Sequence, residues 1–201
     1  MKEKITGIYL AAGKSTRFGD NKLYANVHGK CLGSLALESA IDSLLTETIV
    51  VTKPHDTLEW IPNHLHQDKV IPVACYESWK GQSHSIKCGL HKANKINSNA
   101  VMILLADQPF ISSDWLNQLI DLYKNKKQYA FIASTYKNIP QPPILFNESM
   151  FPSLNNMTGD MGARYLIQKR KRDGYFLEIK DASLVYDIDT KEDYQYIDQR
   201  C

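Results

Sequence analysis

Three positively charged side chains lie in one short stretch near the start of the chain. The stretch Leu10-Ala11-Ala12-Gly13-Lys14-Ser15-Thr16-Arg17-Phe18-Gly19-Asp20-Asn21-Lys22 contains Lys14, Arg17 and Lys22. Small residues and glycines let several backbone N–H groups converge on one anion. The guanidinium of Arg17 can bind two phosphate oxygens, and the ammonium of a lysine acts as a point charge. The residues therefore indicate a phosphate-binding loop, and a solvated turn with ordinary surface lysines is the alternative.

This loop fits neither of the two commonest phosphate-binding patterns. The P-loop pattern requires a glycine where Ile8 stands, and the dinucleotide-binding pattern requires a glycine where Ser15 stands. What remains is a turn with two glycines and three cations after a short apolar run, which suits a strongly negative group such as a triphosphate.

A carboxylate follows the most apolar run of the chain. Asp107 comes directly after residues 100–106 and precedes Gln108-Pro109. At the carboxyl end of a central parallel strand, a carboxylate lies where α/β sheets bind ligands, and Mg²⁺ favours one or two carboxylates together with phosphate oxygens. Asp107 is therefore the first candidate for a magnesium ligand, and a cap for the helix that follows is the alternative. Asp187 or Asp189 is expected to complete the site, unless Asp189 caps the final helix with Thr190.

Short apolar runs alternate with amphipathic stretches along the first two thirds of the chain. This alternation predicts an α/β fold with a doubly wound, mostly parallel sheet between two layers of helices. The expected strands are residues 5–12, 48–52, 70–75, 100–106 and 129–135, with a late strand at 184–188. The expected helices are residues 32–45, 84–93, 112–122 and 162–172, with a last helix capped by Thr190 and Asp193.

Length and composition place the chain among ordinary globular domains. It has 201 residues, 43% of them hydrophobic, and a formal net charge of +2. We expect one domain over residues 1–201, with 136–185 as an insertion or flank on the acceptor side of the sheet. The near-neutral charge and the absence of a long apolar run predict no nucleic-acid or membrane partner. The opening residues do not resemble a signal peptide, and the four cysteines form no C-x-x-C pair, so reduced thiols and a cytoplasmic location are expected.

Six blocks spread over most of the chain resemble one enzyme family, the MobA-like nucleotidyltransferases. Among them, the chain most resembles the molybdenum cofactor cytidylyltransferase (MocA-like) branch, including accessory proteins of xanthine dehydrogenase. The blocks are Leu10–Lys22, Gly81–Leu90, Leu105–Pro109, Pro143–Phe146, Gly159–Arg164 and Asp187–Thr190. The chain departs from the family pattern at Gln141-Pro142, where Gly-His is usual, and at Cys31, which replaces a proline.

The resemblance implies a Rossmann-like nucleotidyltransferase fold and a magnesium-dependent reaction. A nucleoside monophosphate, with CMP from CTP favoured, would be transferred to molybdopterin or the molybdenum cofactor with release of pyrophosphate. Guanylyl transfer, transfer to a sugar phosphate, and a non-catalytic role as cofactor carrier for a xanthine dehydrogenase-type enzyme remain alternatives.

The resemblance also implies a role for each matching residue. The catalytic residues would be Arg17, Lys22 and Asp107, and the metal ligands Asp107 and Asp187. The residues that bind the nucleotide would be Leu10, Ala11, Ala12, Gly13, Ser15, Arg17, Lys22, Gly81, Ser83, Ser85 and Asp107. The acceptor would be bound by Gln108, Asp160 and Arg164, although an ordinary helical salt bridge is the alternative for Asp160 and Arg164.

Overall fold

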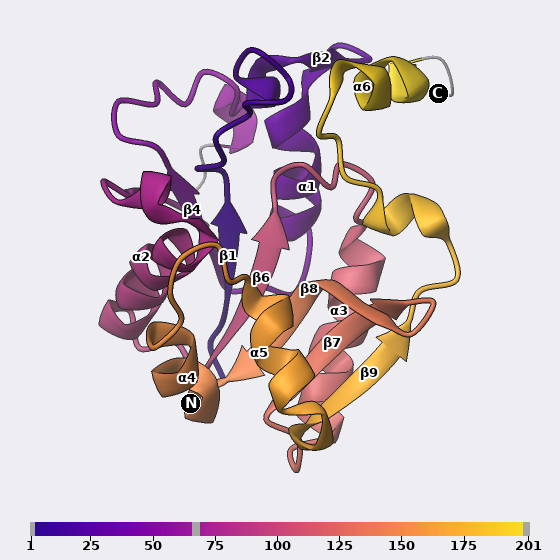
Figure 1. Cartoon of the computed structure of the whole chain (residues 1–201). Coiled ribbons are helices and arrows are strands. Elements are labelled where there is room, and N and C mark those ends of the chain that lie inside the picture. Colours follow the sequence, from indigo (N-terminus) through magenta and orange to yellow (C-terminus); the bar gives the residue numbers. More distant parts are fainter. Residues whose placement is uncertain (1–2, 66–68, 199–201) are drawn as a thin grey trace.

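A computed structural model describes residues 3–65 and 69–198 of the chain (Figure 1). Seven strands form one sheet between two layers of helices, in the order β5-β4-β1-β6-β8-β7-β9. The strands are β1 (Ile5–Leu10), β4 (Glu47–Thr52), β5 (Val70–Ala74), β6 (Ala100–Leu105), β7 (Phe131–Tyr136), β8 (Ile139–Asn147) and β9 (Gly174–Glu178). A two-stranded ribbon of β2 (Asn26–Val27) and β3 (Lys30–Cys31) lies apart from this sheet.

The first half of the sheet is wholly parallel. β1 pairs in parallel with both β4 and β6, so that Ile8 lies between Ile49 and Ile103. Every residue of β1 is buried, as expected of an apolar strand that is covered on both faces. The predicted strands at 5–12, 48–52, 70–75 and 100–106 are confirmed, apart from small differences at their ends.

The second half contains one reversed strand, so the sheet is mostly parallel, as predicted. β8 runs antiparallel to both β6 and β7, and β9 is parallel to β7. Lys137 and Asn138 join β7 to β8 with φ values of 50° and 62°, which are typical of a tight hairpin turn. Residues 136–185, expected as a flank, therefore supply two strands of the central sheet.

The predicted late strand at residues 184–188 is wrong. A 3-10 turn covers Ala182–Val185, and the chain then crosses the carboxyl edge of the sheet. There the backbone N–H of Ile188 donates to the carbonyl of Asp107 (2.9 Å) rather than to a neighbouring strand. Ile188 is buried against Phe18, Val27 and Leu32, which explains its apolar character without a strand.

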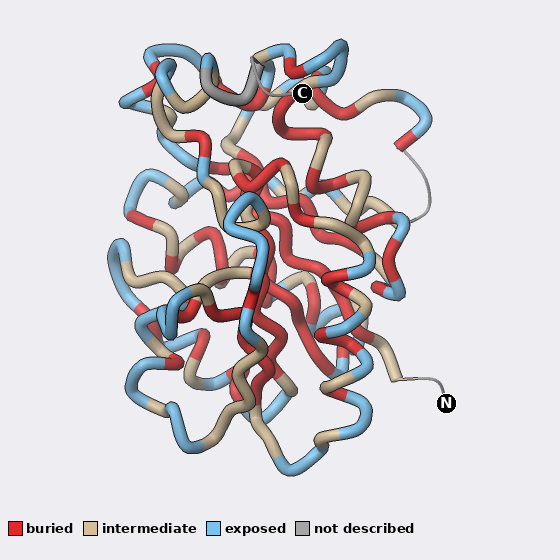
Figure 2. Tube along the Cα trace, turned by 90° about the vertical axis from the view of Figure 1, so that its right-hand side faces the viewer, coloured by how far each residue is buried: buried red, intermediate tan, exposed pale blue. Residues whose placement is uncertain are grey.

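Two helical layers cover the faces of the sheet (Figure 1), and the buried residues gather in the interior (Figure 2). One layer holds α1 (Leu32–Ile41) and α3 (Ser113–Asn125), and the other holds α2 (Gln82–Lys95), α4 (Phe151–Asn155) and α5 (Ala163–Lys169). Gly89 lets α2 approach β1 closely, because a Cβ there would lie 2.4 Å from Ile8 Cγ2. None of the described helices has the length and apolar character to cross a bilayer.

The last helix, α6 (Lys191–Asp198), connects the end of the chain to the first loop. Its predicted capping box is confirmed: Thr190 N–H donates to Asp193 Oδ2 (2.8 Å), and Asp193 N–H donates to Thr190 Oγ1 (3.1 Å). The ring of Tyr194 packs edge-to-face on Phe18. The C-terminal segment therefore lies against the glycine-containing loop, beyond the carboxyl ends of β1 and β6 (Figure 1).

The prediction of reduced thiols is wrong for two cysteines. Cys75, which follows β5, and Cys88 of α2 form a disulfide, with their Cα atoms 5.9 Å apart. The two cysteines meet because the fold packs the end of β5 against α2. They are 13 residues apart in the sequence, a spacing that matches no sequence pattern for a disulfide. Cys31 is free and half-buried, and Cys201 lies outside the described residues.

Candidate functional site

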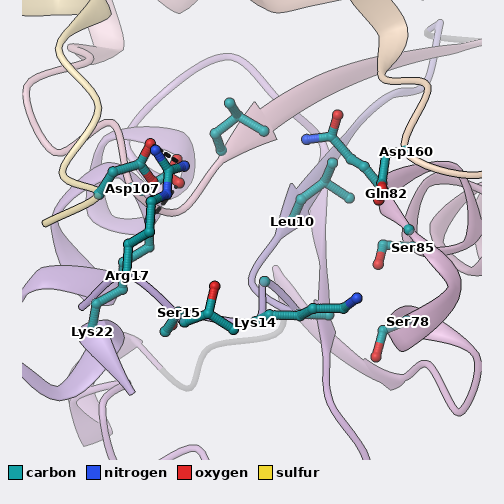
Figure 3. A pocket seen from close by; sticks show the side chains of 16 residues that line it. Leu10, Lys14, Ser15, Arg17, Lys22, Ser78, Gln82, Ser85, Asp107 and Asp160 are labelled. Carbon is teal, nitrogen blue, oxygen red and sulfur yellow. Dashed lines mark hydrogen bonds and ion pairs between the residues drawn. The ribbon is translucent and has the colours of Figure 1, made fainter. Parts of the chain in front are cut away.

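A cavity of about 300 Å³ opens at the carboxyl ends of β1 and β6 (Figure 3). This is the edge where α/β sheets bind ligands, because loops diverge there around the ends of parallel strands. The lining residues come from four segments: the first loop, the turn before α2 with its first residues, the end of β6, and the C-terminal third of the chain. They are Leu10, Ala12–Arg17, Lys22, Ser78, Gly81, Gln82, Ser85, Leu105, Asp107, Asp160 and Asp189.

Lys22 joins three parts of the chain at one end of the cavity. Its Nζ donates to Asp107 Oδ2 (2.8 Å), to the carbonyl of Ile188 (2.8 Å) and to Asp189 Oδ1 (3.0 Å). The residue is 7% exposed. Burial alone would lower the pKa of Lys22, but the charge of Asp107 and the hydrogen bonds to both carboxylates outweigh it and raise the pKa. Lys22 is therefore a permanent cation that holds the two carboxylates at the cavity.

Asp189 is shared between two cations. Its Oδ2 accepts a hydrogen bond from Arg17 Nη2 (2.8 Å), while its Oδ1 contacts Lys22. The backbone of Asp189 is fixed by the α6 cap, since its N–H donates to Asp193 Oδ2 (3.0 Å). Most of the Arg17 side chain is exposed, so its guanidinium has room to move within the cavity.

The two oxygens of Asp107 have different surroundings. Oδ2 is bound to Lys22, whereas Oδ1 is buried and accepts no hydrogen bond from residues 3–65 or 69–198. An unpaired buried carboxylate oxygen is costly, and it fits a position that a cation occupies when ligand is bound. Among the described residues, no group of three or more His, Cys, Asp or Glu side chains could hold a metal by itself. The two carboxylates Asp107 and Asp189 suit Mg²⁺, which completes its shell with phosphate oxygens and waters.

Asp187 does not line the cavity, although it precedes Asp189 by only two residues. It remains accessible to solvent, but neighbouring protein atoms desolvate its carboxyl, and repulsion from Asp107 adds to this effect. Together they raise the pKa of Asp187 to about 6. Gln108 is 2% exposed and lines neither this cavity nor the second one described below.

The opposite end of the cavity is held by backbone contacts. Gly81 has φ of +121°, and a Cβ there would lie 2.4 Å from the carbonyl carbon and oxygen of Gly159. Ser83 is buried, and both its N–H (3.2 Å) and its Oγ (2.7 Å) donate to the Gly159 carbonyl. This junction presents Ser78, Gln82 and Ser85 to the cavity, so hydroxyl and amide groups line that end.

A second cavity adjoins the first. Its volume is about 580 Å³, and Gln82 and Asp160 line both cavities. The other lining residues are Met161, Gly162, Arg164, Tyr165 and Gln168. Within the described part of the chain, no ion pair joins Asp160 to Arg164, so the helical salt bridge considered from the sequence does not form.

Most residues chosen from the sequence meet at the first cavity. Those that line it are Leu10, Ala12, Gly13, Ser15, Arg17, Lys22, Gly81, Ser85, Asp107 and Asp160. Those that do not are Ala11, Ser83, Gln108, Arg164 and Asp187, of which only Arg164 lines the second cavity. Gln82, which the sequence places with Gly81, Ser83 and Ser85 among the residues that could face the base and ribose, also lines the cavity. Sequence reasoning missed Ser78, and it left Asp189 as an alternative to Asp187.

Comparison with known proteins identifies relatives over nearly the whole chain. The family model of the MobA-like NTP transferase domain matches residues 7–174. The purine catabolism protein PucB of Bacillus subtilis (strain 168) is 38% identical over 199 residues, which cover 96% of this chain and 95% of that protein.

Solved structures share the fold at lower identity. Rv0371c from Mycobacterium tuberculosis H37Rv, in complex with manganese, has a TM-score of 0.76 and 20% identity, covering 98% of this chain and 100% of that one. A CMP:2-keto-3-deoxy-manno-octonic acid synthetase complexed with CTP has a TM-score of 0.75 and 11% identity, covering 98% of each chain.

Proposed function

This chain belongs to the MobA-like NTP transferase family, and on that premise we propose that it is a magnesium-dependent nucleotidyltransferase. The proposed donor is CTP, the proposed acceptor is molybdopterin or the molybdenum cofactor, and the products are the cytidylylated cofactor and pyrophosphate. The observation that carries the proposal is the meeting of the first loop, Asp107 and Asp189 at one cavity.

The charges of the cavity favour a nucleotide that arrives with a metal ion. Three cationic side chains, Lys14, Arg17 and Lys22, line it together with the carboxylates Asp107, Asp160 and Asp189. From the sequence alone, the three cations of the loop would suit a triphosphate. In the structure, the three carboxylates that line the same cavity balance their charge. A triphosphate would add net negative charge to this cavity, and a divalent cation offsets it.

Asp107 and Asp189 would hold this cation. The unpaired Oδ1 of Asp107 supports this choice, and the manganese complex of the structural relative Rv0371c is compatible with it. When bound, Mg²⁺ neutralises charge on the phosphate oxygens and so stabilises the transition state. Asp187, the ligand expected from the sequence, is replaced by Asp189 in the proposal, because Asp189 lines the cavity.

The two ends of the cavity differ in their side chains, which supports a proposed orientation of the nucleotide. Arg17 and Lys22 at the charged end would neutralise the phosphates, while Ser78, Gln82 and Ser85 would face the base. Lys22 keeps Asp107 and Asp189 in place, and Arg17 is free to exchange Asp189 for a phosphate oxygen. CTP is favoured because the loop resembles that of the cytidylyltransferase branch, and because a structural relative is known in complex with CTP.

The transfer needs no protein nucleophile. An ionised phosphate oxygen of the acceptor attacks the α-phosphorus, the bond to the β-phosphate breaks, and pyrophosphate leaves with that bond's electron pair. The chain's own residues position the donor and neutralise the developing charge. The second cavity, with Arg164 and Tyr165, is the proposed place for the body of the acceptor because it shares a wall with the first.

Pyrophosphate release tests this function directly. The purified protein is incubated with Mg²⁺, molybdopterin and each of CTP, GTP, ATP and UTP, with a sugar 1-phosphate as the comparison acceptor. We expect release with CTP and molybdopterin only. Release with GTP, or with the sugar phosphate alone, would contradict the assignment of donor or acceptor.

A carrier role is the second candidate, and the similarity to PucB, a purine catabolism protein, favours it. In that role the chain would bind the cofactor and deliver it to a xanthine dehydrogenase-type enzyme. Binding of molybdopterin without turnover of any of the four triphosphates would support the carrier over the transferase.

A further inference from the structure

Two charged side chains lie at the base end of the cavity, the end that Ser78, Gln82 and Ser85 line. Arg17 and Lys22 at the opposite end are ion-paired to Asp189 and Asp107. Lys14 and Asp160, by contrast, make no ion pair or side-chain hydrogen bond within the described residues, although both line the cavity. Their hydrogen-bonding capacity is therefore available to a ligand.

The geometry of the first loop directs two of its cations to different ends. Ser15 has φ of +51°, and its carbonyl accepts hydrogen bonds from the N–H groups of Phe18 (3.1 Å) and Gly19 (3.2 Å). Across this turn, Arg17 lies beside Asp107, whereas Lys14 extends along the floor of the cavity toward Ser78 and Ser85 (Figure 3). A nucleotide that lies along the cavity would run beside Lys14, with the ammonium at its base end.

Asp160 faces the same end from the other wall. Its Oδ1 lies 2.6 Å from the position that a Cβ on Gly81 would take, so it borders the junction between Gly81 and Gly159. Figure 3 shows Asp160 beside Gln82, above Ser85. The base end thus combines an ammonium, which only donates hydrogen bonds, with a carboxylate, which only accepts them when ionised.

We propose that Lys14 and Asp160 select cytosine, a specificity role that rests on the proposed nucleotidyltransferase function. Cytosine carries acceptors at O2 and N3 next to the donor amino group N4, which matches one donor-only and one acceptor-only side chain. Uracil has an N–H donor at position 3 and an acceptor at position 4, so it reverses this pattern. With uracil, the donor Lys14 would face the N–H donor at position 3, and the acceptor Asp160 would face the acceptor at position 4. Neither pair can form a hydrogen bond, so uracil would bind more weakly than cytosine.

Binding of nucleoside monophosphates tests the proposal, because CMP and UMP lack the terminal phosphates. We expect the wild-type protein to bind CMP at least about tenfold more tightly than UMP. Lys14→Met and Asp160→Asn should each bring this ratio toward one, and Lys14→Arg should keep most of it. Lys95→Met is the matched control, since Lys95 is an exposed lysine at the far end of α2.

Pyrophosphate is the second probe, since it has no base. Its affinity in the presence of Mg²⁺ should be the same in Lys14→Met as in the wild type. A loss of pyrophosphate affinity with an unchanged ratio of CMP to UMP would overturn the proposal, because Lys14 would then serve the phosphates. Equal wild-type affinity for CMP and UMP, or for CMP and AMP, would also overturn it.

Measuring the turnover of the triphosphates distinguishes a failure of the specificity proposal from a failure of the proposed transferase function. If no triphosphate is turned over but the preference for CMP depends on Lys14 and Asp160, the transferase fails and the specificity proposal stands. If CTP is turned over but neither variant changes the ratio of kcat/KM for CTP and UTP, only the specificity proposal fails. A change in Asp160→Asn confined to the KM of the acceptor would place Asp160 in the acceptor site and overturn its role toward the base.

Discussion

The two ends of the first cavity are built by different forces. At the charged end, Lys22 and Arg17 of the first loop reach Asp189, which lies 167 and 172 residues further along the chain, through ion pairs. At the base end, Gly81 and Ser83 meet Gly159 through backbone contact and hydrogen bonds. The charged end therefore depends on electrostatics, and the base end depends on close packing.

This difference has a functional consequence. Ion pairs can exchange partners, so Arg17 can leave Asp189 when phosphate arrives. The contact between Gly81 and Gly159 has no charged partner to exchange, and it leaves no room for a Cβ on Gly81. Nucleotidyl transfer requires both selection of the base and neutralisation of the phosphates. The closely packed base end suits the first requirement, and the ion pairs of the charged end, which can exchange partners, suit the second. Substitutions at the two ends should accordingly affect different measurements.

Asp107→Asn should have the largest effect. The substitution keeps the shape of the side chain but removes the charge that would hold Mg²⁺, and we expect kcat to fall by about 100- to 1,000-fold. Lys22 keeps Asp189 and the Ile188 carbonyl as partners, so the fold should survive, which circular dichroism would check. Asp121→Asn, on the exposed face of α3, is the control. Activity within a few-fold of the wild type would contradict the assignment of Asp107.

Asp189→Asn and Asp187→Asn form a matched pair that decides which carboxylate holds the metal. Asp189 lines the cavity and Asp187 does not. We expect Asp189→Asn to raise the Mg²⁺ concentration for half-maximal activity by about 10- to 100-fold. Asp187→Asn should change it much less. The reverse order would restore Asp187, the ligand expected from the sequence.

The sequence predicts the charged end better than the base end. Arg17, Lys22 and Asp107 are recognisable because they follow apolar strands, and the ends of neighbouring parallel strands meet at one edge of a sheet. The residues alone do not separate Asp187 from Asp189, because alternate residues of an extended chain share one face, and only the family resemblance favours Asp187. The chain there instead bonds across the sheet edge through Ile188, and only Asp189 faces the cavity.

At the base end, the decisive contacts are tertiary. Ser78 lines the cavity beside the contact between Gly81 and Gly159, and no local pattern reports a contact between residues so far apart. The Cys75–Cys88 disulfide was missed for the same reason, since it depends on how the end of β5 meets α2. The sheet itself was predictable because long apolar runs identify buried strands, whereas the reversal of β8 carries no comparable signal.

Gly81→Ala should disrupt the base end and leave the charged end intact. The added Cβ would clash with Gly159, and the residue would have to keep φ of +121°, so we expect a loss of about 2 kcal/mol or more in the free energy of unfolding. Gly29→Ala is the matched control, because Gly29 also has positive φ (+84°) but a Cβ added there would meet no atom within 4 Å. It should cost about 1 kcal/mol. Urea unfolding measures both, and equal losses would show that the contact with Gly159 contributes nothing.

Reduction of the Cys75–Cys88 disulfide should have the smallest effect on binding. The residues between the two cysteines include Ser78, Gly81, Gln82 and Ser85, which form the wall at the base end. Closing a loop of this length stabilises a protein by about 3 kcal/mol at most, mainly by restricting the unfolded chain. We therefore expect dithiothreitol to lower the melting temperature, while CMP affinity falls by less than about fivefold, or 1 kcal/mol.

The reason for this small effect is that other contacts hold the same wall. Ser83 donates twice to the Gly159 carbonyl and Gly81 packs on Gly159, and neither contact involves a cysteine. Pyrophosphate affinity should not change at all, because the charged end shares no residue with the closed loop. A Cys75→Ala, Cys88→Ala variant should reproduce the reduced protein, and Cys31→Ser should still respond to dithiothreitol. A large loss of pyrophosphate affinity on reduction would show that the two ends are coupled and that they do not respond separately.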